Sequence, residues 1–403
     1  MKRILFVQPV VAPPGGGEGL GAWMIEALKR DYRLTLLTWK PVDFEDVNRY
    51  FGTELRASEF ELWTTPWAAR LAKLSPTPVV RLRQLYLQMR ARRQAQRFDA
   101  VIWSANEGDL GLGGIQYIHY PEALMKMRSH WYHSFAAVRG YEAISDRLTG
   151  FSLDRMKRSL TLANSEFTAR AIREVYGIEP LVVYPPAIGR FPQLPWEQRK
   201  DGFVCIGRIQ PEKRIERMIE ILAAVRAAGA QVHLHVVGKG NSLGYLVSIR
   251  RLVQANASWV QLHENIARPQ LIELITAHRY GIHAMHNEPF GMAVAELVTG
   301  GCVTFVHNSG GQIEIVGNDE RLIYTSREDA VDKILRAIRE PDYQASLRSY
   351  VSSRRNLFGS ERFVSRIRQV MNDYFGAPPD RNARAPRLAS SPQTGDEPQG
   401  RGP

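Results

Sequence analysis

Short apolar runs alternate with helix-like stretches along most of this 403-residue chain, and this alternation strongly limits the folds available to it. The runs at residues 4–10, 34–39 and 100–103 are almost continuously apolar, which is typical of strands buried on both faces of a parallel sheet. Helical spacing separates them, as at residues 21–29. Strands that alternate with helices in this way predict a doubly wound α/β domain.

A second series of the same kind begins near residue 202 and predicts a second doubly wound domain. Its predicted strands lie at residues 203–206, 232–237, 260–262, 281–284 and 303–306. Its predicted helices lie at residues 215–228, 243–256, 268–277 and 293–299. Two facing domains of this class would place a cleft at the carboxyl ends of both sheets, where such folds bind ligands. We therefore expect functional motifs directly after strands.

Proline marks the expected domain limits. Tyr184-Pro185-Pro186, followed by Pro192 and Pro195, disfavours both helix and central strand. This predicts an N-terminal domain over residues 1–190 and a C-terminal domain over residues 200–358. Residues 376–403 are rich in proline and glycine and poor in apolar side chains, which predicts a disordered tail.

Composition limits the compartment and the class of protein. The sequence has no run close to the ~18 uncharged apolar residues of a membrane span. The N-terminus begins like a signal peptide, but Gln8 and Pro9 interrupt it, so a first buried strand is favoured. With Cys205 and Cys302 alone, neither a disulfide framework nor a multi-cysteine zinc site is expected. We expect a cytoplasmic location.

The net charge of +12 is unevenly distributed. Residues 62–98 hold no acidic residue, and their eight basic residues are Arg70, Lys73, Arg81, Arg83, Arg90, Arg92, Arg93 and Arg97. Apolar and aromatic side chains are interleaved with them, so the segment suits an anionic membrane surface. The alternative is a solvated helix face. A nucleic-acid partner is not expected, because no recognition motif accompanies the charge.

The strongest motif runs from Asn287 to Glu296 and follows the predicted strand at 281–284. Glu288 precedes a Pro-Phe-Gly turn, and a predicted helix then begins near Met292. Free N–H groups at a helix start favour a diphosphate, and carboxylates such as Glu288 and Glu296 accept hydrogen bonds from sugar hydroxyls. The alternative is a pair of ordinary surface glutamates.

Two further segments suggest phosphate contacts. Arg208 and Lys213 lie on a turn after the predicted strand at 203–206 and could neutralise one diphosphate, although a solvent-facing basic turn is the alternative. Gly15-Gly16-Gly17 follows the first strand and lets backbone amides approach a ligand closely. The spacing of Gly17-x-Gly19-x-x-Ala22 is too weak to indicate a dinucleotide fold.

Smaller elements complete the candidate site. His119 ends a strand-like run in the first domain, where a structural histidine is the alternative. Asn308-Ser309-Gly310-Gly311 is a polar turn expected at the same sheet edge as Glu288. Gly238-Lys239-Gly240 lacks the spacing of a phosphate-binding loop. No Asp-x-Asp pair occurs, so we expect neither a catalytic metal nor a resident cofactor.

Taken in order, these segments resemble the retaining glycosyltransferases of family 4, which have the two-domain GT-B fold with Rossmann-like domains. Local strings such as Ile118-His119-Tyr120-Pro121, Ala163-Asn164-Ser165 and the run 281–291 are similar to α-1,2-mannosyltransferases that use GDP-mannose and a lipid-linked oligosaccharide. The resemblance implies transfer of a hexose, with mannose from GDP-mannose favoured, to a lipid-linked or cell-surface glycan. It also implies that a last helix, at residues 359–375, returns to the first domain.

The resemblance implies a role for each candidate residue. Arg208 and Lys213 would hold the donor diphosphate beside the backbone of Phe290, Gly291 and Met292. Glu288 would contact the donor sugar, Glu296 the ribose and His119 the reacting centre. Gly16 and Gly17 would approach donor or acceptor. The acceptor hydroxyl would attack the face of the donor sugar that the diphosphate leaves, and the diphosphate would itself accept the proton of that hydroxyl.

The chain departs from these relatives at two points. They carry an N-terminal membrane anchor, whereas this sequence opens at its first predicted strand, so the basic segment 62–98 would hold it peripherally on the membrane. The glycine loop also lacks the usual basic residue. The alternatives are a UDP-sugar transferase or epimerase on the same fold, and a non-catalytic protein that binds a membrane or nucleic acid.

Overall fold

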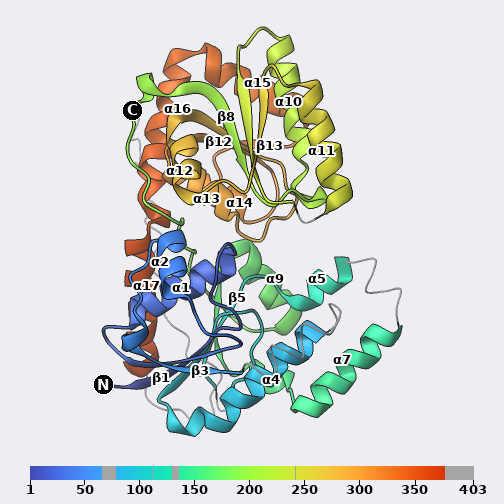
Figure 1. Ribbon diagram of the computed structural model, residues 1–403. Helices are drawn as coiled ribbons and strands as arrows, with labels where there is room; N and C mark the ends of the chain where they lie inside the picture. Colours follow the sequence, from blue (N-terminus) through green and yellow to red (C-terminus); the bar gives the residue numbers. More distant parts are fainter. Residues whose placement is uncertain (66–78, 112, 129–135, 241, 377–403) are drawn as a thin grey trace, which may run out of the picture.

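The computed structural model describes residues 1–65, 79–111, 113–128, 136–240 and 242–376, and these form two α/β domains (Figure 1). Each domain is a parallel sheet with helices on both faces, so the expected doubly wound architecture is confirmed. The chain forms the lower domain in Figure 1, crosses to the upper one and then returns along α17. The predicted tail, apart from Gly376, lies outside the described residues.

The N-terminal sheet has seven parallel strands in the order β3-β2-β1-β4-β5-β6-β7. Their bounds are β1 Arg3–Val7, β2 Arg33–Thr38, β3 Phe60–Thr64, β4 Ala100–Trp103, β5 Ile115–Ile118, β6 Leu160–Ala163 and β7 Leu181–Val182. The α-helices are α1 Gly16–Leu28, α2 Phe44–Phe51, α4 Val79–Gln94, α5 Glu122–Arg128, α7 Ala136–Thr149, α8 Leu153–Met156 and α9 Glu166–Tyr176. Central strands such as β1 and β4 are buried on both faces, which explains their continuous apolar sequence.

The C-terminal sheet has six parallel strands in the order β10-β9-β8-β11-β12-β13. Their bounds are β8 Lys200–Ile206, β9 His233–Gly238, β10 Val260–Glu264, β11 His278–His283, β12 Val303–His307 and β13 Ile323–Tyr324. The α-helices are α10 Ile215–Ala227, α11 Leu243–Ala255, α12 Arg268–Ala277, α13 Met292–Thr299, α14 Gln312–Ile315, α15 Arg327–Arg339 and α16 Pro341–Arg354. From β8 the chain adds β9 and β10 on one side of the sheet, and it then adds β11, β12 and β13 on the other side. In open α/β sheets, ligands bind at the carboxyl ends of the two strands where this change of side occurs, here β8 and β11.

Two crossings join the domains. The linker after β7 meets the returning segment where the Ala187 N–H donates to the carbonyl of Phe358, 2.7 Å away. The helix α17, Ser360–Gly376, then packs on α1: Arg368 Nε donates to the Ala27 carbonyl at 3.0 Å, and Phe363 and Ile367 enter the first domain's core. The last helix therefore belongs physically to the N-terminal domain.

The basic segment is only partly free to meet a membrane. Residues 66–78, including Arg70 and Lys73, lie outside the described residues, as does the side chain of Arg81. In α4, Arg92 forms a 3.0 Å ion pair with buried Asp109, and Arg90 donates to the Thr64 carbonyl at 3.3 Å. Arg93 and Arg97 are exposed. No helix in the described parts of the chain is long and apolar enough to cross a bilayer.

Candidate functional site

A cluster of three ionisable side chains lies at the carboxyl end of the C-terminal sheet. Lys213 Nζ is 2.5 Å from Glu288 Oε2, and His283 Nε2 lies 3.5 Å from the same oxygen. Lys213 ends the short 3₁₀ helix η4, Pro211–Lys213, after β8, whereas His283 ends β11 and Glu288 follows it. The neighbouring strands β8 and β11 thus bring together residues 75 positions apart.

The loop at residues 308–311 positions Glu288 through its backbone. Gly310 forms an isolated parallel bridge with Glu288, and the Gly311 N–H donates to the Glu288 carbonyl at 2.7 Å. A Cβ atom at Gly310 would lie 2.4 Å from that carbonyl oxygen, and its φ of +79° also favours glycine. The side-chain amide of Gln312 donates to three carbonyls, those of Met285, His307 and Ser309. The polar turn of the sequence is therefore the support of Glu288.

Burial and charge act in opposite directions on this cluster. Burial, the largest single influence, raises the pKa of Glu288, but Lys213, His283 and Arg208 together outweigh it, and the pKa lies below its ordinary value. Burial, assisted by Lys213, lowers the pKa of His283 to about 4. The site therefore holds an ionised carboxylate and a neutral imidazole at neutral pH. Neither ring nitrogen of His283 has a hydrogen-bond partner among the described residues.

Arg208 lies close to Lys213, as the sequence predicted for a phosphate-binding pair. Both residues and His283 line one crevice at the end of β8. Arg208 is exposed, so its guanidinium is accessible to a ligand. Its positive charge also helps to lower the pKa of Glu288.

The helix α13 begins at Met292, where the sequence places the diphosphate. Gly291 precedes it with a φ of +109°, and an added Cβ there would lie 3.3 Å from Ile315. Gly291, the residue at the N-cap, has no side chain to cap this helix start, and free N–H groups of this kind favour an anionic ligand. The ring of Phe290 is buried and stacks on Tyr184 of the linker, with ring centroids 5.9 Å apart. Phe290 thus offers only its backbone to the cleft.

Glu296 has a partner that the sequence analysis missed. Arg268 forms a two-point ion pair with it, at 2.7 and 3.1 Å, and the two side chains are 7% and 6% exposed. The same guanidinium donates to the carbonyl of Ile188 in the linker. Arg268 opens α12, a position that sequence spacing does not connect with Glu296. The ribose role of Glu296 stays a prediction, for which a carboxylate still has acceptor capacity.

The N-terminal domain brings glycine backbone and a histidine to the opposite wall. A Cβ atom added to Gly16 would lie 3.4 Å from Met292 Cγ, and one added to Gly17 would lie 3.4 Å from His119 Nε2. The start of α1 therefore lies close to both the start of α13 and the His119 ring. This contact unites the predicted glycine loop, His119 and the diphosphate helix in one site.

The environment of His119 defines its protonation. Its Nε2 lies 3.0 Å from the carbonyl of Ser104, which can only accept, so Nε2 carries the hydrogen. Burial lowers its pKa below the ordinary value, and the ring is neutral at neutral pH. Asn106 fixes the backbone by accepting from the His119 N–H at 2.8 Å. Nδ1 is therefore the nitrogen that can accept a hydrogen bond from a ligand hydroxyl.

Hydrogen bonds hold the two walls together near Glu288. The carboxylate of Glu314, on α14, accepts from the backbone N–H groups of Glu166 and Phe167 at 2.8 Å each, which caps the start of α9 from the other domain. The Ser165 hydroxyl donates to the Pro289 carbonyl at 2.5 Å. The sequence analysis gave Glu314 no role, and only its place after the glycine turn could have suggested one.

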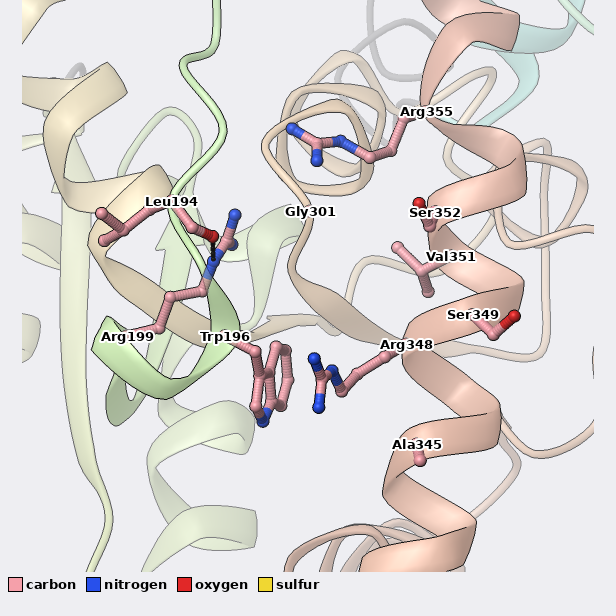
Figure 2. Close-up of a pocket in the computed structure, with 10 residues that line it drawn as sticks. All are labelled: Leu194, Trp196, Arg199, Gly301, Ala345, Arg348, Ser349, Val351, Ser352 and Arg355. Carbon is pink, nitrogen blue, oxygen red and sulfur yellow. Dashed lines mark hydrogen bonds between the residues drawn. The ribbon is translucent and has the colours of Figure 1, made fainter.

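A separate cavity lies away from this cleft. It has a volume of about 410 Å³ and is lined by Trp196 and by three arginines, Arg199, Arg348 and Arg355 (Figure 2). Gly301, beyond the C-terminal end of α13, also lines it, whereas the cleft lies at the opposite end of that helix. None of its ten lining residues carries a carboxylate, so the cavity is not part of the candidate site.

Sequence comparison agrees with this geometry. Residues 190–354 match the family described as "Glycosyl transferases group 1". The chain is similar to GDP-Man:Man(3)GlcNAc(2)-PP-Dol alpha-1,2-mannosyltransferases. The Mus musculus protein is 27% identical over 224 residues, covering 51% of this chain and 43% of the relative. The Homo sapiens protein is 25% identical over 249 residues, covering 56% and 48%. The match thus spans less than half of each relative.

Comparison with solved structures confirms the GT-B fold. Anabaena Alr3699/HepE in complex with UDP and glucose superposes with a TM-score of 0.65 at 16% identity, covering 93% of this chain and all of that one. WaaG, a glycosyltransferase involved in lipopolysaccharide biosynthesis, gives the same TM-score, identity and coverage. Identity this low shows the fold alone, so the chemistry has to be argued from the site.

Proposed function

We propose that this protein is a retaining hexosyltransferase that moves mannose from GDP-mannose to a lipid-linked or cell-surface glycan. The match to group 1 glycosyltransferases and the GT-B fold support a glycosyltransferase. The observation that carries the proposal is the Lys213–Glu288–His283 cluster, which residues 308–311 support at the carboxyl end of the C-terminal sheet. Mannosyltransferase names among the relatives favour this donor.

On the donor side, positive charge lies where a leaving diphosphate would gain negative charge. Arg208, Lys213 and the uncapped start of α13 at Met292 stabilise that charge together. Glu288, ionised beside Lys213, accepts hydrogen bonds from the hydroxyls of the donor sugar and fixes its orientation. Glu296, oriented by Arg268, accepts from the ribose.

On the acceptor side, the groups are neutral. Gly16 and Gly17 leave room for the sugars to approach the backbone, and His119 Nδ1 accepts from a sugar hydroxyl. The bond from the anomeric carbon to the diphosphate oxygen breaks, and the acceptor oxygen bonds to that carbon on the same face. Bond formation on that face retains the anomeric configuration. The diphosphate oxygen takes the acceptor proton, so the mechanism needs no protein base, and it assigns no role to a metal.

The test combines binding with turnover. The Tm of the purified chain is measured alone and with GDP, UDP, ADP and their sugars, each in EDTA and in Mg²⁺. Labelled GDP-mannose is then offered with a lipid-diphosphate oligosaccharide. A ligand that binds the native state raises Tm, by an amount that corresponds to ~2.7 kcal/mol at a hundred times its Kd. We expect a GDP-dependent shift of equal size in both buffers, and transfer of mannose.

Each other result changes the proposal in a defined way. A shift with UDP alone would keep the fold and replace the donor, in favour of a UDP-sugar transferase or epimerase. A shift that requires Mg²⁺ would overturn the metal-free mechanism. Stabilisation by a nucleotide without turnover of any sugar would favour a non-catalytic binding protein.

A further inference from the structure

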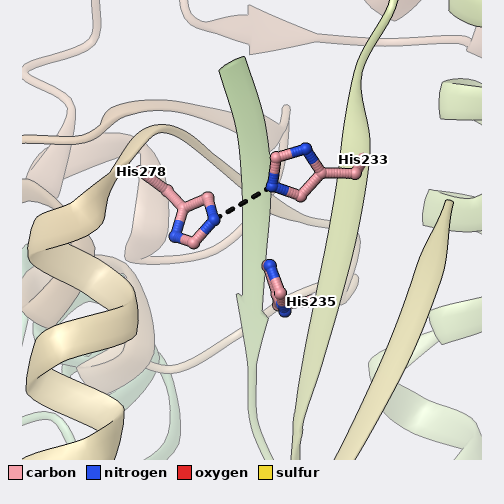
Figure 3. Close-up of side chains that lie close together, drawn as sticks. All are labelled: His233, His235 and His278. Atoms are coloured by element: carbon pink, nitrogen blue, oxygen red, sulfur yellow. Dashed lines mark hydrogen bonds between the residues drawn. The ribbon is translucent and has the colours of Figure 1, made fainter. Parts of the chain in front are cut away.

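Three histidines lie close together near the amino ends of strands in the C-terminal sheet, whereas the candidate site lies at the carboxyl ends (Figure 3). His233 and His235 lie on β9, and His278 opens β11, while β8 runs between these two strands. One nitrogen of each ring lies within 4.8 Å of the other two. His235 and His278 are 8% and 1% exposed, so the cluster is largely shielded from water.

A glycine on the intervening strand makes this convergence possible. A Cβ atom on Gly202 of β8 would lie 2.2 Å from Nε2 of His233. The missing side chain leaves the space through which His233 reaches across β8, and its Nε2 lies 3.0 Å from Nε2 of His278. Any larger residue at 202 would displace the His233 ring from the cluster.

Hydrogen bonding orients His278 as a ligand. Its Nδ1 lies 2.6 Å from the Leu274 carbonyl, which can only accept, so Nδ1 carries the hydrogen and Nε2 directs a lone pair at His233. A carbonyl on the distal nitrogen is the usual outer support of a metal-binding histidine. His235 Nδ1 contacts His263 Nε2 at 2.8 Å, which restrains a second ring. The rings are neutral because burial lowers their pKa values.

We propose that His233, His235 and His278 bind one Zn²⁺ ion. Three neutral imidazoles suit zinc, with Zn–N distances of about 2.0–2.1 Å and water as a fourth ligand. The alternative is a network of N–H···N hydrogen bonds without metal.

The position of the cluster gives the ion a structural role. His278 and His283 are the two ends of β11, about 16 Å apart at ~3.3 Å per residue, so the ion would lie far from Glu288. It would join β9 to β11 across β8, at the end of α12 whose first residue, Arg268, supports Glu296. The ion takes no part in transfer, so this proposal is independent of the proposed function.

The first experiment measures metal in the intact chain. The tag-free protein is produced with zinc in the medium, gel-filtered and assayed by mass spectrometry for metals. We expect about one zinc per chain, as a three-histidine site requires. Dialysis against EDTA should lower Tm, and equimolar Zn²⁺ should restore it. A metal-free chain whose Tm does not respond to equimolar Zn²⁺ would overturn the proposal.

Variants locate the ion. G202A displaces His233 while leaving all three imidazoles in the chain, and should weaken zinc binding at least ~10-fold, the usual minimum for disturbing a metal site's support. H278Q should abolish zinc binding. The control H307Q removes a histidine at the opposite sheet edge and should leave the zinc content unchanged. Equal zinc affinity in G202A, H307Q and the natural protein would refute the assignment.

A titration of the EDTA-treated natural protein with Co²⁺ keeps the test decisive if H278Q does not fold. Cobalt held by three imidazoles and water in a tetrahedral site absorbs strongly in the visible region, and G202A should reduce that absorption. If the natural protein with Co²⁺ showed no more than the weak absorption of the hydrated ion, the proposal would be contradicted.

Discussion

The C-terminal wall of the cleft presents paired charges, whereas the N-terminal wall presents glycine backbone and a neutral imidazole. Glu288 and Glu296 each have a cationic partner, Lys213 at 2.5 Å and Arg268 at 2.7 Å. On the other wall, Gly17 touches His119, whose charged form burial disfavours. The difference suggests that the C-terminal wall supplies electrostatic stabilisation, while the N-terminal wall supplies shape.

Removing the charged pair should produce the largest effect. K213A and E288A each take away a group that would act on developing charge, and loss of one such group typically costs ~10²–10³-fold in rate. The fold should survive, because Lys213 and Glu288 follow strands at the carboxyl end of the sheet and are not part of its hydrophobic core. Initial rates of sugar transfer and circular dichroism measure the two consequences.

The pair Lys333–Asp329, 3.0 Å apart on α15, provides a matched control. K333A removes a lysine from a comparable ion pair far from the cleft and should leave the rate within about twofold, as for a distant site. Near-native turnover by K213A or E288A, or an equal loss in K333A, would show that the site is misassigned.

A second buried carboxyl extends the comparison, because it has the opposite electrostatic environment. Glu107 follows β4 on the N-terminal wall, and burial, with repulsion from Glu122, raises its pKa to about 7. Its folded pKa lies above that of the unfolded chain, so its contribution to stability is present below about pH 4.5 and is lost as the pH rises through 7. E107Q keeps a neutral group and should flatten this dependence.

Urea unfolding at pH 5 and pH 8 measures the effect of Glu107. The free energy of unfolding of the natural protein should fall between these pH values by ~2–3 kcal/mol more than that of E107Q. Tyr176 donates to Glu107 at 2.6 Å, and because this hydrogen bond lowers the pKa of Glu107, Y176F should raise that pKa further. Parallel pH profiles for the natural protein and E107Q would contradict the raised pKa.

The third effect concerns shape. G17A places a methyl group between the start of α1 and His119, without removing charge. We expect KM to rise about tenfold, which corresponds to ~1.4 kcal/mol, with a smaller change in kcat. G244A is the control, because an added Cβ there meets nothing within 4 Å. An unchanged KM in G17A would show that no ligand approaches this loop.

The fold was accessible from sequence, as were the positions of the charged candidate residues after predicted strands, because both signals are local. Continuous apolar runs identify buried parallel strands, and Glu288, Gly291 and Met292 lie in the loop after one of them and at the start of the next helix. Strand ends were less accurate: β1 ends at Val7 instead of residue 10, where Pro9 lacks the N–H that a central strand requires. β11 begins at His278, three residues before its predicted start, because its first two residues, His278 and Arg279, are polar and do not extend the apolar run.

The supporting contacts could not be predicted because they depend on which strands are neighbours. Arg268 meets Glu296 only after α12 and α13 have packed on the same sheet. The turn at residues 308–311 was recognised, but its bridge to Glu288 requires β11 beside β12. His233 and His278 are 45 positions apart and meet across Gly202, which no spacing rule reveals.

The smallest expected effect comes from the contact that joins the two walls. E314A removes the carboxylate that accepts from the Glu166 and Phe167 N–H groups and from the Tyr184 hydroxyl. Water can bind these donors in place of the carboxylate. The free energy of unfolding should therefore fall by about 1 kcal/mol, within the usual range for a partly exposed hydrogen bond. Transfer should fall several-fold, because the two walls then lose these hydrogen bonds and keep those that Ser165 and Thr168 donate to the Pro289 carbonyl. E320A removes an exposed acid of the same domain and is the control. An equal loss of transfer in E320A would show that the effect of E314A does not come from the contact between the two walls.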